Sequence, residues 1–245
     1  MTRLFLIRHG ETEWSKHGKH TSVTDLPLTE LGEEQARKLL AHLQPADFGL
    51  VLSSPRRRAW VTAELGGFIG RYAPKIDEDL VEWSYGGFEG LTSDQIRSKV
   101  PDWTIWTHPA SGGETAGQVA ARLDRVIARV RTSGVDQAIC FGHGHALRAL
   151  TMRWLDFDLS LGVQFPLDTS TVSVLGEEKN QRRCGSGMPR FDQRLALRVA
   201  SSRRPADSSR AAARLVVPTT ITASGTGVPF SNAPTSGATA PPMTN

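Results

Sequence analysis

The stretch Leu4-Phe5-Leu6-Ile7-Arg8-His9-Gly10-Glu11-Thr12 is the starting point for predicting the fold. The apolar run of residues 4–7 favours a strand that is buried on both faces of a sheet. Ligands of open α/β sheets bind just beyond the carboxyl ends of the strands, which is where Arg8 and His9 would lie. Gly10 would let the backbone turn sharply and approach a ligand. An arginine beside an imidazole is suited to hold and attack a phosphate. For this stretch alone, a strand that ends in two polar residues is an equally good explanation.

The length and composition predict a globular protein in a reducing compartment. The chain has 245 residues, of which 39% are hydrophobic and 22% are charged. No apolar run approaches the ~18 residues that a membrane span needs, and no secretory signal is recognisable at the N-terminus. Two cysteines, Cys140 and Cys184, do not make a disulfide framework. We therefore expect a cytoplasmic protein.

The net charge of +4 is unevenly distributed along the chain. Residues 180–245 hold nine arginines and two aspartates, a balance of +7, which leaves 20 basic and 23 acidic residues in residues 1–179, a balance of −3. The first part therefore gives no reason to expect a nucleic-acid binder. The second part is rich in Pro, Ser, Thr, Ala and Gly. We expect a folded domain at residues 1–179 and a disordered basic tail at residues 180–245.

Strands and helices are expected to alternate along the first part. The strands are expected at residues 4–7, 48–53, 75–80, 137–141 and 171–175, and the helices at residues 29–43, 55–65, 92–99, 114–131 and 145–154. In the longest helix, Val119, Leu123 and Val126 recur at the spacing of one buried face. The alternation predicts an α/β fold, a three-layer α/β/α sandwich with a mostly parallel central sheet.

Polar groups follow three of these strands directly. They are Arg8-His9-Gly10, Ser54-Pro55-Arg56-Arg57-Arg58 and Gly142-His143-Gly144. If the three strands are parallel neighbours, the cationic side chains at their ends meet at one edge of the sheet. Clustered arginines and histidines repel one another, and a bound dianion such as phosphate removes that cost. A fourth group, Glu82-Trp83-Ser84-Tyr85-Gly86, lies in a loop rich in glycine and aromatic residues.

These four motifs, in this order, resemble those of the histidine phosphatase superfamily, also called the phosphoglycerate mutase-like family. The family's Arg-His-Gly signature corresponds to residues 8–10, and the resemblance covers residues 3–175. It implies that His9 is the nucleophile, which becomes a phosphohistidine, and that Glu82 donates a proton to the leaving oxygen. It also implies a set of groups that bind the phosphoryl oxygens, namely Arg8, Arg58 and His143. Arginines neutralise the charge in this scheme, so neither a metal nor a cofactor is expected.

The residue types agree with these roles. An imidazole attacks only when it is neutral, and flanking cations help by lowering its pKa. Arg58 is chosen over its arginine neighbours because it precedes Ala59 and lies four residues before Thr62, although three consecutive arginines are also typical of a solvated helix start. The alternative interpretation of Glu82 is a carboxylate in a surface loop. Of the other histidines, His145 and His108 are expected near the site, and His17, His20 and His42 on the surface.

The segment of residues 88–113 favours a phosphatase over a mutase. Mutases of the family typically carry a long insertion here, with basic residues for a second acidic group of the substrate. This segment is short, and it carries Trp103 and Trp106, which form either a packed lid or an aromatic wall for a less charged substrate. Ser15 and Ser22 also depart from the Asn and Gly that are usual in mutases.

We therefore expect a phosphomonoesterase. The alternative is cofactor-dependent phosphoryl transfer of the phosphoglycerate mutase type, and a more remote one is nucleic-acid binding through the basic tail. The stretches at residues 17–29, 82–86 and 144–148 look most similar to sedoheptulose-1,7-bisphosphatase and related broad-specificity phosphatases. A sugar phosphate is the substrate class that this resemblance implies.

The expected partner is a small phosphate ester, with no nucleic acid and no membrane, and a homo-oligomer is left open. The expected substrate contacts are Arg8, Thr12, Ser15, Thr21, Ser22, Arg58, Tyr85, His145 and Arg148. Arg148 lies one helical turn into the last helix, where it would reach a second phosphate or form a salt bridge at the edge of the core.

Overall fold

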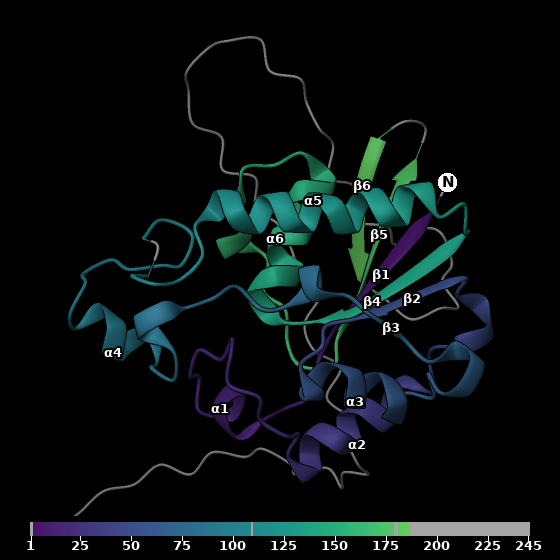
Figure 1. Ribbon diagram of the computed structural model, residues 1–245, viewed down its shortest axis with the longest axis horizontal. Coiled ribbons are helices and arrows are strands. Elements are labelled where there is room, and N and C mark those ends of the chain that lie inside the picture. The colour runs from purple at the N-terminus through teal and green to yellow at the C-terminus, as the bar shows by residue number, and fades with distance from the viewer. Residues whose placement is uncertain (1, 109, 179–180, 187–245) are drawn as a thin grey trace, which may run out of the picture. The chain divides into compact units, whose positions relative to one another are not determined.

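The computed structural model describes residues 2–108, 110–178 and 181–186, which are built around one six-stranded sheet (Figure 1). The strands are β1 (Arg3–Arg8), β2 (Leu50–Ser53), β3 (Lys75–Ile76), β4 (Gln137–Gly142), β5 (Val172–Glu178) and β6 (Gln181–Ser186). They lie in the order β3-β2-β4-β1-β5-β6. The four strands from β3 to β1 are parallel, whereas β5 is antiparallel to β1 and β6 to β5. The predicted mostly parallel sheet is confirmed.

Helices cover both faces of this sheet. The α-helices are α1 (Glu13–Lys16), α2 (Glu30–Leu39), α3 (Arg57–Leu65), α4 (Ser93–Arg97), α5 (Ala116–Thr132) and α6 (Gly144–Leu155). The 3₁₀ helices are η1 (Pro45–Asp47), η2 (Gly70–Tyr72), η3 (Glu78–Leu80), η4 (Gly86–Phe88) and η5 (Leu159–Gln164). Helices α5 and α6 lie on one face and α2 and α3 on the other (Figure 1). This is the predicted three-layer α/β/α sandwich.

Strand β1 contributes to the core on both faces. Leu4 and Leu6 pack into the cluster that includes α5 and α6, whereas Phe5 and Ile7 pack into the cluster that includes α2 and α3. All four side chains are at most 5% exposed. Because successive strand residues point to opposite faces, a strand covered on both sides must be apolar at every position.

The segment at residues 75–80 differs from the sequence prediction, because only Lys75 and Ile76 form a strand. The side chain of Asp77 accepts a hydrogen bond from the backbone N–H of Asp79 at 3.0 Å. Such an Asx turn competes with extended structure. It starts η3 and so ends the strand two residues into the predicted segment.

The sheet also extends past the predicted domain end at residue 179. Strand β6 pairs with β5 through residues that show no apolar alternation, so the sequence pattern did not predict it. An outer strand is held by backbone hydrogen bonds, which any side chain permits. The remaining tail residues, 187–245, lie outside the described part of the chain. No helix within the described ranges is long and apolar enough to cross a membrane.

Candidate active site

The carboxyl ends of β1, β2 and β4 lie side by side. Arg8 pairs with Gly142 at the end of the parallel ladder. The ladder continues for one bond on each side, because the N–H of His9 donates to the carbonyl of Gly142 at 3.0 Å and the N–H of Ser54 donates to that of Phe141 at 2.9 Å. The three polar motifs that follow these strands therefore meet at one edge of the sheet, as the sequence predicted.

The loop after β1 is held against α2 and α3. A Cβ atom at Gly10 would lie 2.3 Å from the carbonyl oxygen of Gly32, and one at Gly32 would lie 2.1 Å from that of Glu11. Two backbones thus cross with no room for a side chain on either. The N–H of Gly10 also donates to Oγ1 of Thr62, in α3, at 3.0 Å. These contacts fix the residue that follows His9.

His9 is held in one tautomer. Its Nδ1 lies 2.7 Å from the carbonyl oxygen of Gly10, and since a carbonyl can only accept, Nδ1 carries the hydrogen. Burial, and then the guanidinium groups of Arg58 and Arg8, hold the pKa of His9 well below its ordinary value. The neutral ring therefore presents its lone pair on Nε2, and a neutral imidazole is the form that can act as a nucleophile.

His143 is held in the opposite tautomer. Nε of Arg58, which can only donate, lies 3.2 Å from Nδ1 of His143. The proton of the neutral ring is therefore on Nε2, which lies 2.8 Å from Oγ of Ser54. Burial, and then Arg58 and His9, lower the pKa of His143 well below its ordinary value. The ring centroids of His9 and His143 lie 5.2 Å apart.

Arg58 is fully buried and holds a loop as well as His143. Its terminal nitrogens donate to three backbone carbonyls, at 2.8 Å to Thr24 and at 3.2 Å each to Thr21 and Ser22. The sequence prediction placed Arg58 against phosphoryl oxygens. The structure adds that its guanidinium fixes the segment of residues 21–24 beside the site.

Arg8 is the last residue of β1, and its guanidinium lies near Glu82, because a Cβ atom at Gly144 would lie 3.6 Å from the one and 3.7 Å from the other. One terminal nitrogen donates to the carbonyl of Leu167 at 2.5 Å, and Nε is buried with no hydrogen-bond partner among the described residues. Burial lowers the pKa of Arg8, and the negative charge of Glu82 opposes that shift. An unpartnered buried N–H costs free energy, and a phosphoryl oxygen would satisfy it.

Glu82 is buried at the N-terminus of α6. Its Oε1 accepts the backbone N–H of Ala146 at 2.7 Å and that of Trp83 at 2.8 Å. Its Oε2 accepts the N–H of His145 at 3.0 Å. Helix N-termini favour acidic groups because their N–H groups lack partners within the helix. The alternative of a surface-loop carboxylate is therefore wrong, since Glu82 is 6% exposed.

Tyr85, His145 and His20 form a second group beside Glu82. The hydroxyl of Tyr85 lies 2.6 Å from Nδ1 of His145. The ring of His20 packs against Tyr85, with centroids 4.7 Å apart, and against Trp103, at 5.2 Å. The prediction that His20 is a surface residue is wrong, and its burial lowers its pKa to about 4. A lone histidine in a polar stretch gave no sign of these distant aromatic partners.

The two tryptophans form the packed lid rather than an open wall. Trp103 is 2% exposed and Trp106 9% exposed. The ring of Trp103 packs edge-on against Phe88 at 5.6 Å, and that of Trp106 packs edge-on against Trp83 at 5.4 Å. Of the two alternatives for this segment, the structure favours burial in the core.

Several expected substrate contacts have partners within the protein. Thr12 and Ser15 cap α1 reciprocally. Oγ of Ser22 donates to Glu89 at 2.5 Å. Arg148 donates twice to the carbonyl of Gly162, at 2.9 and 2.6 Å. The salt bridge considered for Arg148 is replaced by these carbonyl contacts, and the substrate role of all these residues stays a prediction.

Glu89 is a residue of the site's surroundings that the sequence analysis missed. Its carboxylate accepts the N–H of Ser22 at 2.9 and 3.0 Å and the N–H of Thr24 at 3.1 Å. Burial opposes the charge, but these hydrogen bonds hold the pKa of Glu89 below its ordinary value. Glu89 thus holds through backbone N–H groups the same segment that Arg58 holds through backbone carbonyls. No local pattern marks Glu89 for this role, because its partners lie 65 and 67 positions earlier in the chain.

No group of three or more His, Cys, Asp or Glu side chains with the arrangement of a metal site occurs in residues 2–108, 110–178 and 181–186. The arginines described at this edge, Arg8 and Arg58, are charged, whereas His9 and His143 are neutral because their pKa values are lowered.

A family model described as "Histidine phosphatase superfamily (branch 1)" matches residues 4–186 of this chain. The chain belongs to the histidine phosphatase superfamily. Among curated members, the acid phosphatase of Mycobacterium tuberculosis is 40% identical over 185 residues, which are 74% of this chain and 89% of the relative. The sedoheptulose 1,7-bisphosphatase of Saccharomyces cerevisiae is 34% identical over 196 residues, 68% of this chain and 71% of the relative.

Solved structures of this superfamily share the fold. The product of an open reading frame of Mycobacterium tuberculosis has a TM-score of 0.71 at 37% identity and covers 75% of this chain and 95% of its own. The α-ribazole phosphatase from Shigella flexneri has a TM-score of 0.66 at 27% identity and covers 76% of this chain and 95% of its own. Because this chain belongs to the superfamily and its relatives are named phosphatases, it is an enzyme, as the sequence motifs predicted.

Proposed function

We propose that the protein hydrolyses small phosphate monoesters through a phosphohistidine on His9. The observation that carries this proposal is the state of that ring. Its Nδ1–H is held by Gly10 and its low pKa keeps it neutral, so Nε2 is free to attack. The buried Nε–H of Arg8, which has no partner among the described residues, is suited to bind a phosphoryl oxygen nearby.

The proposed reaction has two displacements at phosphorus. In the first, the Nε2 lone pair of His9 forms a bond to phosphorus while the ester P–O bond breaks, and the leaving oxygen takes a proton from the Glu82 carboxyl group. In the second, a water molecule attacks phosphorus and gives its proton to the Glu82 carboxylate. The P–N bond breaks, its electron pair returns to Nε2, and inorganic phosphate leaves.

A sugar phosphate is the proposed substrate class. Support comes from the relative named sedoheptulose 1,7-bisphosphatase, which is 34% identical. A relative named phosphoserine phosphatase, at 29% identity over 189 residues, shows that members similar to this chain bear other substrate names. The panel of esters used as a test therefore includes sugar phosphates, sugar bisphosphates and phosphoserine.

Phosphate release from this panel is measured in the presence of a chelator, together with interconversion of phosphoglycerates. We expect release from at least one sugar phosphate, loss of release in His9→Ala, and no loss in the control His17→Ala, whose imidazole is exposed. Interconversion without release would replace the proposal with mutase-type transfer. Full activity of His9→Ala would exclude His9 as the nucleophile.

A further inference from the structure

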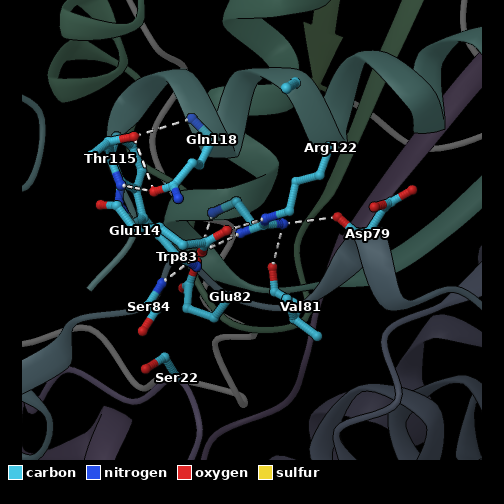
Figure 2. Close-up of polar contacts among 12 residues, drawn as sticks. Ser22, Asp79, Val81, Glu82, Trp83, Ser84, Glu114, Thr115, Gln118 and Arg122 are labelled. Carbon is cyan, nitrogen blue, oxygen red and sulfur yellow. Dashed lines mark hydrogen bonds and ion pairs between the residues drawn. The ribbon is translucent and has the colours of Figure 1, made fainter. Parts of the chain in front are cut away.

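A partly buried ion pair contacts the loop that carries Glu82 (Figure 2). Nε of Arg122 lies 2.7 Å from Oε1 of Glu114, and a terminal nitrogen lies 3.0 Å from Oε2. The Arg122 side chain is 8% exposed and that of Glu114 22% exposed. A fork of two parallel hydrogen bonds fixes the orientation of both groups as well as their distance.

Arg122 holds the chain just before Glu82. Its remaining terminal nitrogen donates to the carbonyl of Val81 and to that of Asp79, each at 2.8 Å. Figure 2 shows the guanidinium reaching from α5 toward these carbonyls. Four hydrogen bonds are thus made by one side chain, which only the planar guanidinium with its five donors permits.

Glu114 holds the chain just after Glu82. Its Oε2 accepts the N–H of Ser84 at 2.9 Å. Its backbone carbonyl accepts Nε1–H of Trp83 at 2.9 Å, and its N–H donates to the carbonyl of Ser84 at 3.1 Å. The residue on either side of Glu82 is therefore tied to the ion pair, and the Glu82 carboxyl group itself contacts backbone N–H groups of α6.

Helix α5 keeps the two partners of the ion pair in register. Glu114 immediately precedes Thr115, which caps the helix and exchanges hydrogen bonds with Gln118. Arg122 lies further along the same helix. The helix therefore sets the spacing of the two backbone positions, and the two side chains bridge that spacing through the paired hydrogen bonds.

We infer that Arg122 and Glu114 are positioning residues for Glu82. They hold its carboxyl group at the position from which it protonates the leaving oxygen. Neither residue makes any of the contacts described around His9. The inference rests on the proposed function, in which Glu82 is the proton donor. A small displacement of a catalytic group costs up to about 10²-fold in rate. Because the group that the pair positions is the proton donor, we expect its displacement to slow the protonation of the leaving oxygen in particular.

The test compares two esters in the variant Arg122→Lys. An alkyl phosphate has a leaving group that departs only with a proton, whereas p-nitrophenyl phosphate has one that departs without help. The measured quantity is kcat/KM, which covers the steps up to release of the alcohol. We expect a loss of about 10²-fold for the alkyl ester and little change for the nitrophenyl ester.

A second variant and a control accompany it. Glu114→Gln keeps the shape of the side chain but removes the charge, and we expect the same selective loss with a smaller size. Arg125→Ala removes a neighbouring arginine of α5 that pairs with the side chain of Asp79 and is 59% exposed, and we expect no selective loss. Equal losses on both esters in the two variants, or no loss, would overturn the inference, as would failure of both variants to fold.

Glu82→Gln separates this inference from the proposed function. A loss in Glu82→Gln that is confined to the alkyl ester supports the proton-donor role, whatever Arg122→Lys does. If Glu82→Gln is selective and Arg122→Lys is not, only the positioning inference fails. If Glu82→Gln affects both esters equally, the proton-donor role fails and takes the inference with it.

Discussion

Replacing Gly10 with alanine tests the close crossing of the loop after β1 with α2. The added Cβ would lie 2.3 Å from the carbonyl oxygen of Gly32 and 2.9 Å from its carbonyl carbon. Both are backbone atoms of a helix, so neither moves aside as a flexible side chain would. Overpacking a rigid site costs about 1–3 kcal/mol, and we expect the upper end, about 3 kcal/mol, in the free energy of unfolding.

The same substitution acts on activity, because the carbonyl of Gly10 holds Nδ1 of His9. We expect Tm to fall by roughly 6–12 °C, from the roughly 2–4 °C per kcal/mol of a domain this large, and kcat/KM to fall by up to about 10²-fold. Circular dichroism melting and phosphate release measure the two effects.

Gly117→Ala is the matched control. Gly117 lies in α5 with open space around its missing side chain, so alanine there should stabilise the protein by up to about 1 kcal/mol. A Gly10→Ala variant that melts no lower than the wild type, with full activity, would refute the steric argument. A matching fall in Gly117→Ala would show that any loss of glycine is harmful, whatever the contacts.

Three further outcomes follow from the surroundings of the site. The free energy of unfolding should fall as the pH drops from about 6.5 toward about 4, because the unfolded chain binds a proton at His20 in this window and the folded chain does not. His20→Gln should remove on the order of 3 kcal/mol of that fall, and an unchanged pH slope in urea unfolding would contradict this. Glu89→Gln should lower the free energy of unfolding by about 1.5–3 kcal/mol, because hydrogen bonds from the segment at residues 22–24 lose their charged acceptor; a Tm equal to that of the wild type would refute it. Arg148→Lys should raise KM for a sugar bisphosphate and a monophosphate by the same factor, because the guanidinium is bound to the carbonyl of Gly162. A rise confined to the bisphosphate would instead assign Arg148 to a second phosphate.

The fold could be predicted from the sequence where burial leaves a strong pattern. Residues 4–7 are apolar without interruption because both faces of β1 are covered. The same reasoning placed the ends of β2 and β4 beside His9, since parallel strands bring their carboxyl ends to one edge. Strand β6 could not be predicted this way, because its residues show no apolar alternation and its pairing with β5 leaves no pattern in the sequence.

The sequence predicted which polar motifs meet at the edge of the sheet, but it did not predict the residues that hold those motifs in place. Glu89 holds Ser22 across 67 positions of the chain, and Arg122 holds Val81 across 41 positions. Such pairs leave no periodicity and no local motif, because any spacing is allowed once the chain has folded. His20 was placed wrongly for the same reason, since its aromatic neighbours come from three separate segments.

The opposite tautomers of His9 and His143 make the two rings unequal toward reagents. His9 has its lone pair on Nε2, whereas His143 has a proton there and its lone pair engaged by Arg58. An electrophile that acylates imidazole should therefore label His9 and spare His143, although the rings are only 5.2 Å apart. Nitrogen chemical shifts would show the same asymmetry without any label. Substrates and covalent inhibitors therefore meet two different imidazole nitrogens. Nε2 of His9 offers a lone pair, and Nε2 of His143 carries a hydrogen.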